Sequence, residues 1–199
     1  MSKYLNDMKD ALRRYLTAAQ KAEREIMAID RDYKPEVRKE KISDIKFALS
    51  NERVKAVDAI MAAKRGGLAE AERWGELRVG DLTSDKELLS IGLRLTQAEY
   101  DNLCRKYTSN GSMSRLLDEY ATKNNRELAY QNPGVLFPPG YLTRTYLQTP
   151  EKIGEKWEKM AATAENVLAS IDRTGYYGGA NNPMVINSVE NFGNNAEGI

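Results

Sequence analysis

The sequence contains no histidine and a single cysteine, and these absences exclude much of enzyme chemistry. Histidine has the side-chain pKa closest to neutrality, so without it most catalytic triads, proton relays and common zinc or iron sites cannot be built. Cys104 has no second cysteine for a disulfide or a paired metal site, and no histidine to activate it as a nucleophile. We expect Cys104 to be a small buried side chain.

Long apolar runs and signature motifs are also missing. No run of about 18 apolar residues occurs, and the chain is charged and amphipathic from Lys3 onward, so we expect neither a membrane span nor a signal peptide. Phosphate-binding, dinucleotide-binding, zinc-protease, serine-hydrolase and EF-hand patterns are absent. The sequence therefore predicts a cytoplasmic non-enzyme with no catalytic, cofactor-binding or metal-binding residues.

Charge of one sign is not in excess either. The 30 Lys and Arg residues face 29 Asp and Glu residues, so the net charge of +1 attracts neither nucleic acid nor an anionic membrane. Residues 1–75 carry a mild basic surplus, with 17 Lys and Arg against 13 Asp and Glu. A charged fraction of 30% favours helices with wide solvated faces. We expect partners to be recognised by shape and apolar contact.

Residues 1–79 predict long helices with heptad patterning. Steps of three and four alternate along the apolar residues Leu5, Met8, Leu12, Tyr15, Ala19, Ala22, Ile26, Ile29 and Tyr33, a spacing typical of a helix that packs on a partner helix. Pro35 marks a kink or the start of a second helix, and a hairpin and a bent rod are both open. Gly66 and Gly67 predict a hinge or a break.

The second helix of this region carries two adjoining apolar stripes. One consists of Ile42, Ile45, Leu49, Ala56, Ile60 and Ala63, and the other of Phe47, Val54, Val57 and Met61. A helix with two apolar stripes is expected to contact more than one neighbour.

Residues 80–128 predict a small module of three helices, at about 85–93, 97–107 and 112–124. Capping-box patterns beginning at Ser84 and Thr96 mark two of the helix starts. The expected common core is Leu88, Leu89, Leu93, Leu95, Tyr100, Leu103, Cys104, Tyr107, Met113, Leu116, Leu117 and Tyr120. The last two helices could form a DNA-binding helix-turn-helix, but the charges of the module cancel, which favours a packing or protein-docking hairpin.

Residues 129–174 predict an irregular apolar loop followed by one further long helix. The loop holds Pro133, Pro138 and Pro139, and it either packs across a helix of the same chain or docks on another subunit. Thr149 and Pro150 start the helix. Its apolar row is Ile153, Trp157, Met160, Ala164, Val167 and Ile171, which we expect to pair with the N-terminal seam, within one chain or between chains.

Residues 175–199 contain five glycines and six asparagines, a composition that predicts a flexible or extended tail. Within it an apolar group, Met184, Val185, Ile186, Val189 and Phe192, could bind a partner as a short strand or hook. The alternative is an ordinary disordered tail.

The sequence runs from charged heptad helices through the segment LTQAEYDNLCRKYTSNGSMSRLLDEYATKNN (residues 95–125) to a Gly- and Asn-rich end. This layout resembles that of the small helical structural proteins of tailed phages and prophages of Gram-positive bacteria. These include scaffold-like and minor virion proteins. The resemblance implies a role in particle assembly, in the host cytoplasm or the virion, with a homo-oligomer or other phage proteins as partners. It assigns no functional residue. The Pro-rich loop departs from scaffold proteins, which tend to be more acidic and more uniformly helical.

Two functions from different classes are therefore open. The first is a mainly α structural or assembly protein that associates through its helical seams and tail. Its expected contact residues are Leu5, Met8, Leu12, Tyr15, Ile26, Ile29, Ile153, Trp157, Met160, Val185, Ile186 and Phe192. The second is a regulatory module that binds a host protein or nucleic acid through the mildly basic N-terminal helices, although balanced charge weighs against nucleic acid.

Overall fold

The computed structural model describes residues 3–31, 33–91, 93–173 and 179–194, and every regular element in these ranges is helical. This confirms the predicted mainly α fold. The chain forms two compact units. Among the described residues, the first unit contains those up to Gly67 and those from Lys156 onward, and the second contains those from Leu68 to Glu155.

These units differ from the four predicted ranges 1–79, 80–128, 129–174 and 175–199. Helices α2 (Pro35–Trp74) and α6 (Pro150–Asp172) each contribute residues to both units. The C-terminal segment also returns to the first unit, where helix α7 (Pro183–Glu190) lies against α1 (Lys3–Met27). Sequence composition changes at the predicted boundaries, whereas packing follows helices that run through them.

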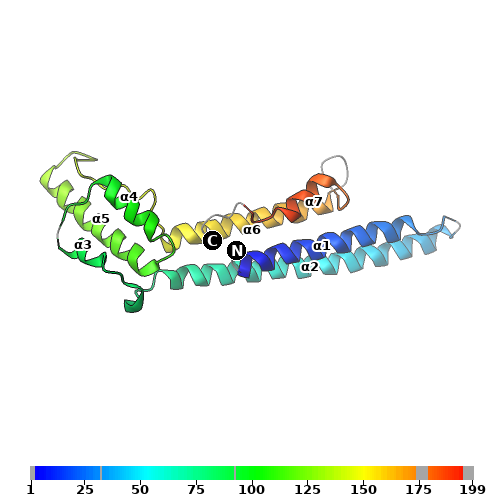
Figure 1. Ribbon diagram of the computed structural model, residues 1–199. Coiled ribbons are helices and arrows are strands. Elements are labelled where there is room, and N and C mark those ends of the chain that lie inside the picture. Colours follow the sequence, from blue (N-terminus) through cyan, green and yellow to red (C-terminus); the bar gives the residue numbers. More distant parts are fainter. Residues whose placement is uncertain (1–2, 32, 92, 174–178, 195–199) are drawn as a thin grey trace. The chain divides into compact units, whose positions relative to one another are not determined.

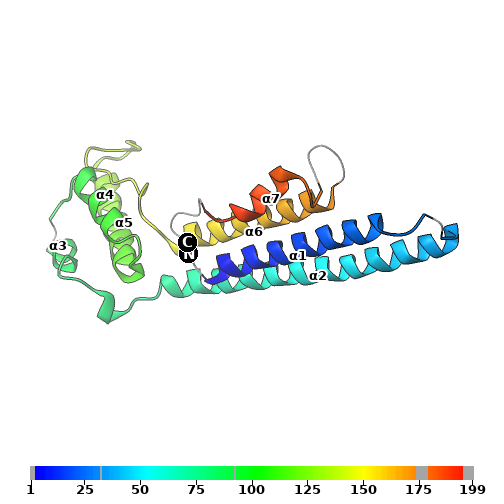
Figure 2. The ribbon, with the colours of Figure 1, turned by 45° about the vertical axis from the view of Figure 1, so that its right-hand side comes forward.

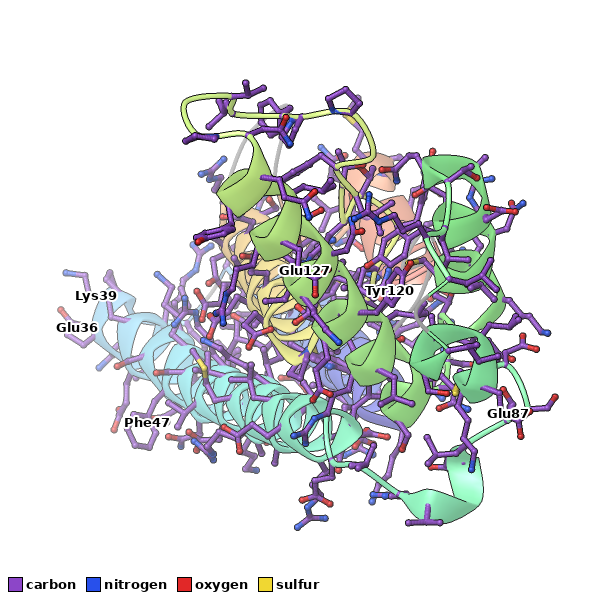
Figure 3. The ribbon with its side chains drawn as sticks, turned by 90° about the vertical axis from the view of Figure 1, so that its left-hand side faces the viewer. Glu36, Lys39, Phe47, Glu87, Tyr120 and Glu127 are labelled. Carbon is purple, nitrogen blue, oxygen red and sulfur yellow. The ribbon has the colours of Figure 1, made fainter. Side chains whose placement is uncertain are left out.

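In the first unit α1 and α2 form a hairpin rather than a bent rod (Figures 1 and 2). Pro35 is the first residue of α2, a position where its missing N–H is not needed. Of the two stripes of α2, one places Ala56, Ile60 and Ala63 in the core. The other includes Phe47, which projects outward from the helix (Figure 3). The predicted division into two stripes is thus a division between an inner and an outer face.

Of the predicted hinge or break at Gly66 and Gly67, the break is wrong, because both residues lie inside the continuous helix α2, although the boundary between the two units falls after Gly67. Their lack of a side chain allows close packing instead. A Cβ on Gly67 would lie 2.3 Å from Cδ2 of Trp157, and one on Gly66 would lie 2.3 Å from Cε1 of Tyr4. The two aromatic rings meet edge to face with their centroids 6.0 Å apart. Glycine here removes steric bulk beneath an aromatic pair.

The two glycines should respond differently to alanine. Gly67→Ala is expected to destabilise the protein by about 1–3 kcal/mol, because the buried Trp157 ring has no room to move. Gly66→Ala is expected to be neutral or to stabilise by up to about 1 kcal/mol, because Tyr4 is only half-buried and alanine favours the helix. Urea unfolding followed by circular dichroism compares the two variants, and equal losses from both would contradict this packing.

Helix α6 and helix α7 complete the first unit. The buried row of α6 within this unit is Trp157, Ala161, Ala164, Val167, Leu168 and Ile171. The predictions of a flexible or extended tail and of a short strand are both wrong for residues 183–190, because these residues form α7, with Pro183 at its start and the Asn182 side chain accepting a hydrogen bond from Met184 N–H. The prediction of a flexible tail at residues 175–178 and 195–199 lies outside the described residues.

The second unit contains η1 (Val79–Asp81), α3 (Lys86–Ser90), α4 (Gln97–Lys106) and α5 (Gly111–Gln131). Thr96 and Glu99 form the predicted capping box of α4, with a 2.8 Å hydrogen bond from Thr96 N–H to the Glu99 carboxylate. The predicted box at Ser84 is wrong. Asp85 stands before α3 without capping it, because its carboxylate accepts hydrogen bonds from Lys106 and Tyr107.

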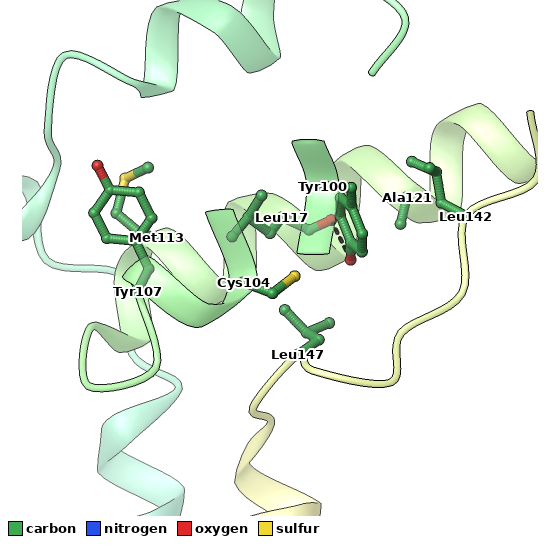
Figure 4. Packing of buried hydrophobic residues seen from close by; sticks show 8 residues of the cluster. All are labelled: Tyr100, Cys104, Tyr107, Met113, Leu117, Ala121, Leu142 and Leu147. Carbon is green, nitrogen blue, oxygen red and sulfur yellow. Dashed lines mark hydrogen bonds between the residues drawn. The ribbon is translucent and has the colours of Figure 1, made fainter. Parts of the chain in front are cut away.

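A single apolar cluster forms the core of this unit (Figure 4). Its buried members are Tyr100, Cys104, Tyr107, Met113, Leu117, Ala121, Leu142 and Leu147, and Leu82, Leu89, Leu95, Leu103, Leu116 and Tyr120 pack around them. Most of the predicted module core is therefore found here. Leu88 and Leu93 are exceptions, since both are exposed. Leu142 and Leu147 come from the Pro-rich loop, so the loop contributes to this core.

Candidate functional site

The predicted α1 contact residues lie inside the first unit. Leu5, Met8, Leu12 and Tyr15 are almost fully buried, and Ile26 near the end of α1 is half-buried. Ile29, in the turn after α1, is also half-buried. In this arrangement the heptad seam packs within one chain, and it can reach a second chain only if the helices separate.

The predicted contact residues of α6 and the tail fall into two groups. Trp157, Val185 and Phe192 are buried and Met160 and Ile186 are half-buried, all in the first unit. Ile153 is half-buried and belongs to the second unit. The structure therefore brings most of the predicted seam residues together within a single chain.

A polar group joins three helices of the first unit. Asp172 at the end of α6 accepts a hydrogen bond from the Tyr15 hydroxyl of α1, and its other carboxylate oxygen lies 2.6 Å from Arg53 Nε of α2. Burial, with the hydrogen bond to Asp172, raises the pKa of Tyr15. The hydrogen bond to Asp172 raises the pKa of Arg53. Both side chains are held in their ordinary protonation states, so the group fastens the helices together.

Polar contacts also fasten α7 to α1. Arg13 and Glu190 form an ion pair of 2.5 Å, and Gln20 Nε2 donates to the Ala180 carbonyl at 3.0 Å. The hydrogen bond from Arg13 lowers the pKa of Glu190. A Cβ on Gly193 would lie 2.9 Å from Leu5 Cγ. The apolar tail residues thus cover the start of the N-terminal seam.

The outer face of α2 is formed by Phe47, Val54, Val57 and Met61. The side chains recur in steps of seven, three and four, so they follow one line on the helix. Phe47 is 70% exposed and Val54 is 55% exposed, while Val57 and Met61 are half-buried. A line of large apolar groups at heptad spacing on a helix surface is suited to a partner helix.

The second unit exposes an apolar group that we call the loop tip, formed by Tyr130 in the last turn of α5 and by Val135, Leu136 and Phe137 of the loop. The sequence left open whether this loop packs on the same chain or docks on another subunit. In the structure one part of the loop is exposed and another part is buried. The tip is exposed, whereas Leu142 and Leu147 further along are buried. Sequence alone did not reveal this division, since the exposed Leu136 and the buried Leu142 and Leu147 are the same residue type.

The turn between α4 and α5 does not present a DNA-reading helix. In a helix-turn-helix the first residues of the second helix contact base edges. Here the corresponding residues of α5, Ser112, Met113 and Ser114, are buried, and the Ser112 hydroxyl accepts a 2.7 Å hydrogen bond from Arg78 N–H. These residues support packing within the second unit and are not free to enter a groove.

Reactive groups contribute little to a site. Cys104 is 1% exposed, and burial raises the pKa of its thiol to about 11, which makes it unreactive near neutral pH. Over the described ranges no group of three or more Cys, Asp or Glu side chains is arranged to hold a metal ion. Within those same ranges no helix combines the length and the apolarity required to cross a bilayer.

Comparison of the chain with protein families, curated proteins and solved structures gave no match. The candidate sites are the outer face of α2 in the first unit and the loop tip in the second.

Proposed function

We propose that the protein is a non-enzymatic structural or assembly protein that acts through helix–helix association, in the particle of a tailed phage. The observation that carries the association is the exposed outer face of α2. The phage context rests on the resemblance of the sequence layout. Self-association through this face makes the partner a second copy of the chain.

The outer face of α2 is favourable for association because it is apolar and already ordered. Its backbone belongs to a continuous helix whose opposite face is packed in the core, so binding orders only side chains. Burying a Phe or Val side chain that is exposed in the monomer contributes about 1.5–3 kcal/mol when burial is complete. Two copies meeting along this face would bury Phe47 and Val54 twice.

Charge substitutions on this face test the proposal. Phe47→Glu combined with Val54→Glu is expected to weaken association by about 100-fold or more, because carboxylates would be placed in an apolar contact. The measurement is the solution mass by light scattering coupled to size exclusion, compared with the 22.4 kDa of one chain. Both side chains are exposed, so the circular dichroism spectrum should not change.

The matched control is Met184→Glu, an equally drastic change at an exposed apolar residue of α7 in the same unit. It should leave the mass as in the unmodified protein. An unmodified chain that stays monomeric would contradict the proposal, and so would a Phe47→Glu and Val54→Glu variant that associates as before.

A further inference from the structure

The loop tip lies within the longest stretch of the second unit's sequence that contains no charged residue. No charged residue occurs between Glu127 and Arg144, in a chain of which 30% is charged. Tyr130 is 88% exposed, Leu136 is 79% exposed, Phe137 is 64% exposed and Val135 is 49% exposed. Together the four side chains expose roughly 500 Å², within the range of the largest apolar patches on monomers, which are often functional.

Two turns of the same kind flank the loop residues of the tip, 135–137. Val135 N–H donates to the Asn132 carbonyl at 3.2 Å across Pro133 and Gly134, and Tyr141 N–H donates to the Pro138 carbonyl at 3.0 Å across Pro139 and Gly140. The glycines have φ of 87° and 86°. A proline followed by a glycine with positive φ is the pattern of a type II turn. Residues 135–137 are therefore held between two stiff turns.

Side-chain amides fix the chain that follows the second turn. Asn125 donates to the Leu142 carbonyl at 2.9 Å and accepts from Leu142 N–H at 2.8 Å. Gln97 makes the same pair of bonds with Thr143, at 3.2 and 2.7 Å. One side chain of α5 and one of α4 thus bond to the N–H and the carbonyl of two consecutive loop residues. A tip presented in this way loses little conformational freedom on binding.

We propose that the loop tip is a contact between two copies of this chain, related by a two-fold axis. Residues close to a two-fold axis lie near their own copies, so a charge at the axis would meet a like charge. The tip satisfies this condition, since it contains no charge. Two tips together bury roughly 1,000 Å², which is at the lower limit for a specific interface and corresponds to a weak, concentration-dependent contact.

The absence of charge at the tip does not favour a lipid membrane as its binding partner. Loops and helices that bind membrane surfaces combine apolar residues with Lys or Arg for the anionic headgroups. Here the neutral segment separates the tip from any neighbouring cation in the sequence. A second protein copy has no such requirement.

Cysteine cross-linking tests the proposed contact directly. Leu136→Cys introduces the one accessible thiol, because Cys104 is buried and its pKa is raised. With a mild oxidant such as diamide, we expect the full-length variant to form a disulfide-linked dimer at least about tenfold faster than Val79→Cys. Val79 is a suitable control, since it is 79% exposed, apolar and in the same unit, but it is not part of the tip. Equal rates for the two variants would overturn the proposal.

A second experiment separates this contact from that of α2. Phe137→Asp should raise the dissociation constant of the tip contact about 100-fold, an effect that light scattering detects as a lower mass. It should do so also in a chain that carries Phe47→Glu and Val54→Glu, where only the tip contact remains. If Phe137→Asp lowers the mass and the α2 substitutions do not, the result supports the tip contact and contradicts the α2 contact. If the α2 substitutions lower the mass and Phe137→Asp does not, the result overturns the tip contact and supports the proposed function.

Discussion

Gly111→Ala is expected to destabilise the protein by more than about 3 kcal/mol. A Cβ at this position would lie 1.7 Å from the carbonyl oxygen of Trp74 and 2.8 Å from its carbonyl carbon. Both are backbone atoms at the end of α2, so no side chain can rotate to make room. Relief requires a shift of α5 away from the end of α2, which would disturb the hydrogen bond from Arg78 N–H to Ser112.

The measurement for Gly111→Ala is the urea midpoint, with circular dichroism as the signal. Gly80→Ala provides the control, because Gly80 has no heavy atom within 4 Å of the added Cβ. The control should change the free energy of unfolding by no more than about 0.5 kcal/mol. Closely similar midpoints for the two variants would mean that α5 does not pack on Trp74 as described.

Asn125→Ala is expected to cost about 2–4 kcal/mol. The substitution leaves the N–H and the carbonyl of Leu142 without their partner, and Leu142 is almost fully buried, so water cannot easily replace the amide. An unsatisfied buried polar group costs about 1–3 kcal/mol. The loop residues Leu142 and Leu147 should then loosen from the core of the second unit.

Asn124→Ala is the matched control for this prediction. Asn124 precedes Asn125 in α5, is half-buried, and gives the loop one hydrogen bond, of 3.1 Å to the Gly140 carbonyl. Its loss should cost no more than about 1 kcal/mol. Chemical denaturation measures both variants, and hydrogen exchange at Leu142 N–H should accelerate in Asn125→Ala only. Comparable effects of the two substitutions would argue against the paired amide bonds.

Local sequence rules predicted several helix starts because the interactions concerned are local. Thr96 and Glu99 are three residues apart, and the side chain of each accepts a hydrogen bond from the backbone N–H of the other. Pro35 and Pro150 are first residues of helices, where proline fits without strain. The alternation of apolar residues likewise predicted the inner faces of α1 and α6.

Other features depend on residues far apart in the sequence, and the sequence did not reveal them. Gly66 and Gly67 resemble a break until Tyr4 and Trp157 are placed against them. The sequence does not show that the Asp85 carboxylate accepts hydrogen bonds from Lys106 and Tyr107 instead of capping α3. The tail segment 183–190 has little helix propensity of its own and is stabilised by packing on α1.

The candidate sites show the same limit. A heptad seam specifies that a helix partner exists, but not whether it belongs to the same chain, and the structure uses the α1 seam internally. The second stripe of α2 was predicted from spacing, and its exposure became evident only once the first stripe was packed. The part of the loop that follows the tip is held by Asn125 and Gln97, through hydrogen bonds to residues 17 and 46 positions away.

Both proposed contacts require the chain to self-associate, which the solution mass of the unmodified full-length chain measures over a range of concentrations. The proposed contacts predict a mass that rises above 22.4 kDa with concentration. A mass that stays at 22.4 kDa up to the highest soluble concentration would contradict both contacts.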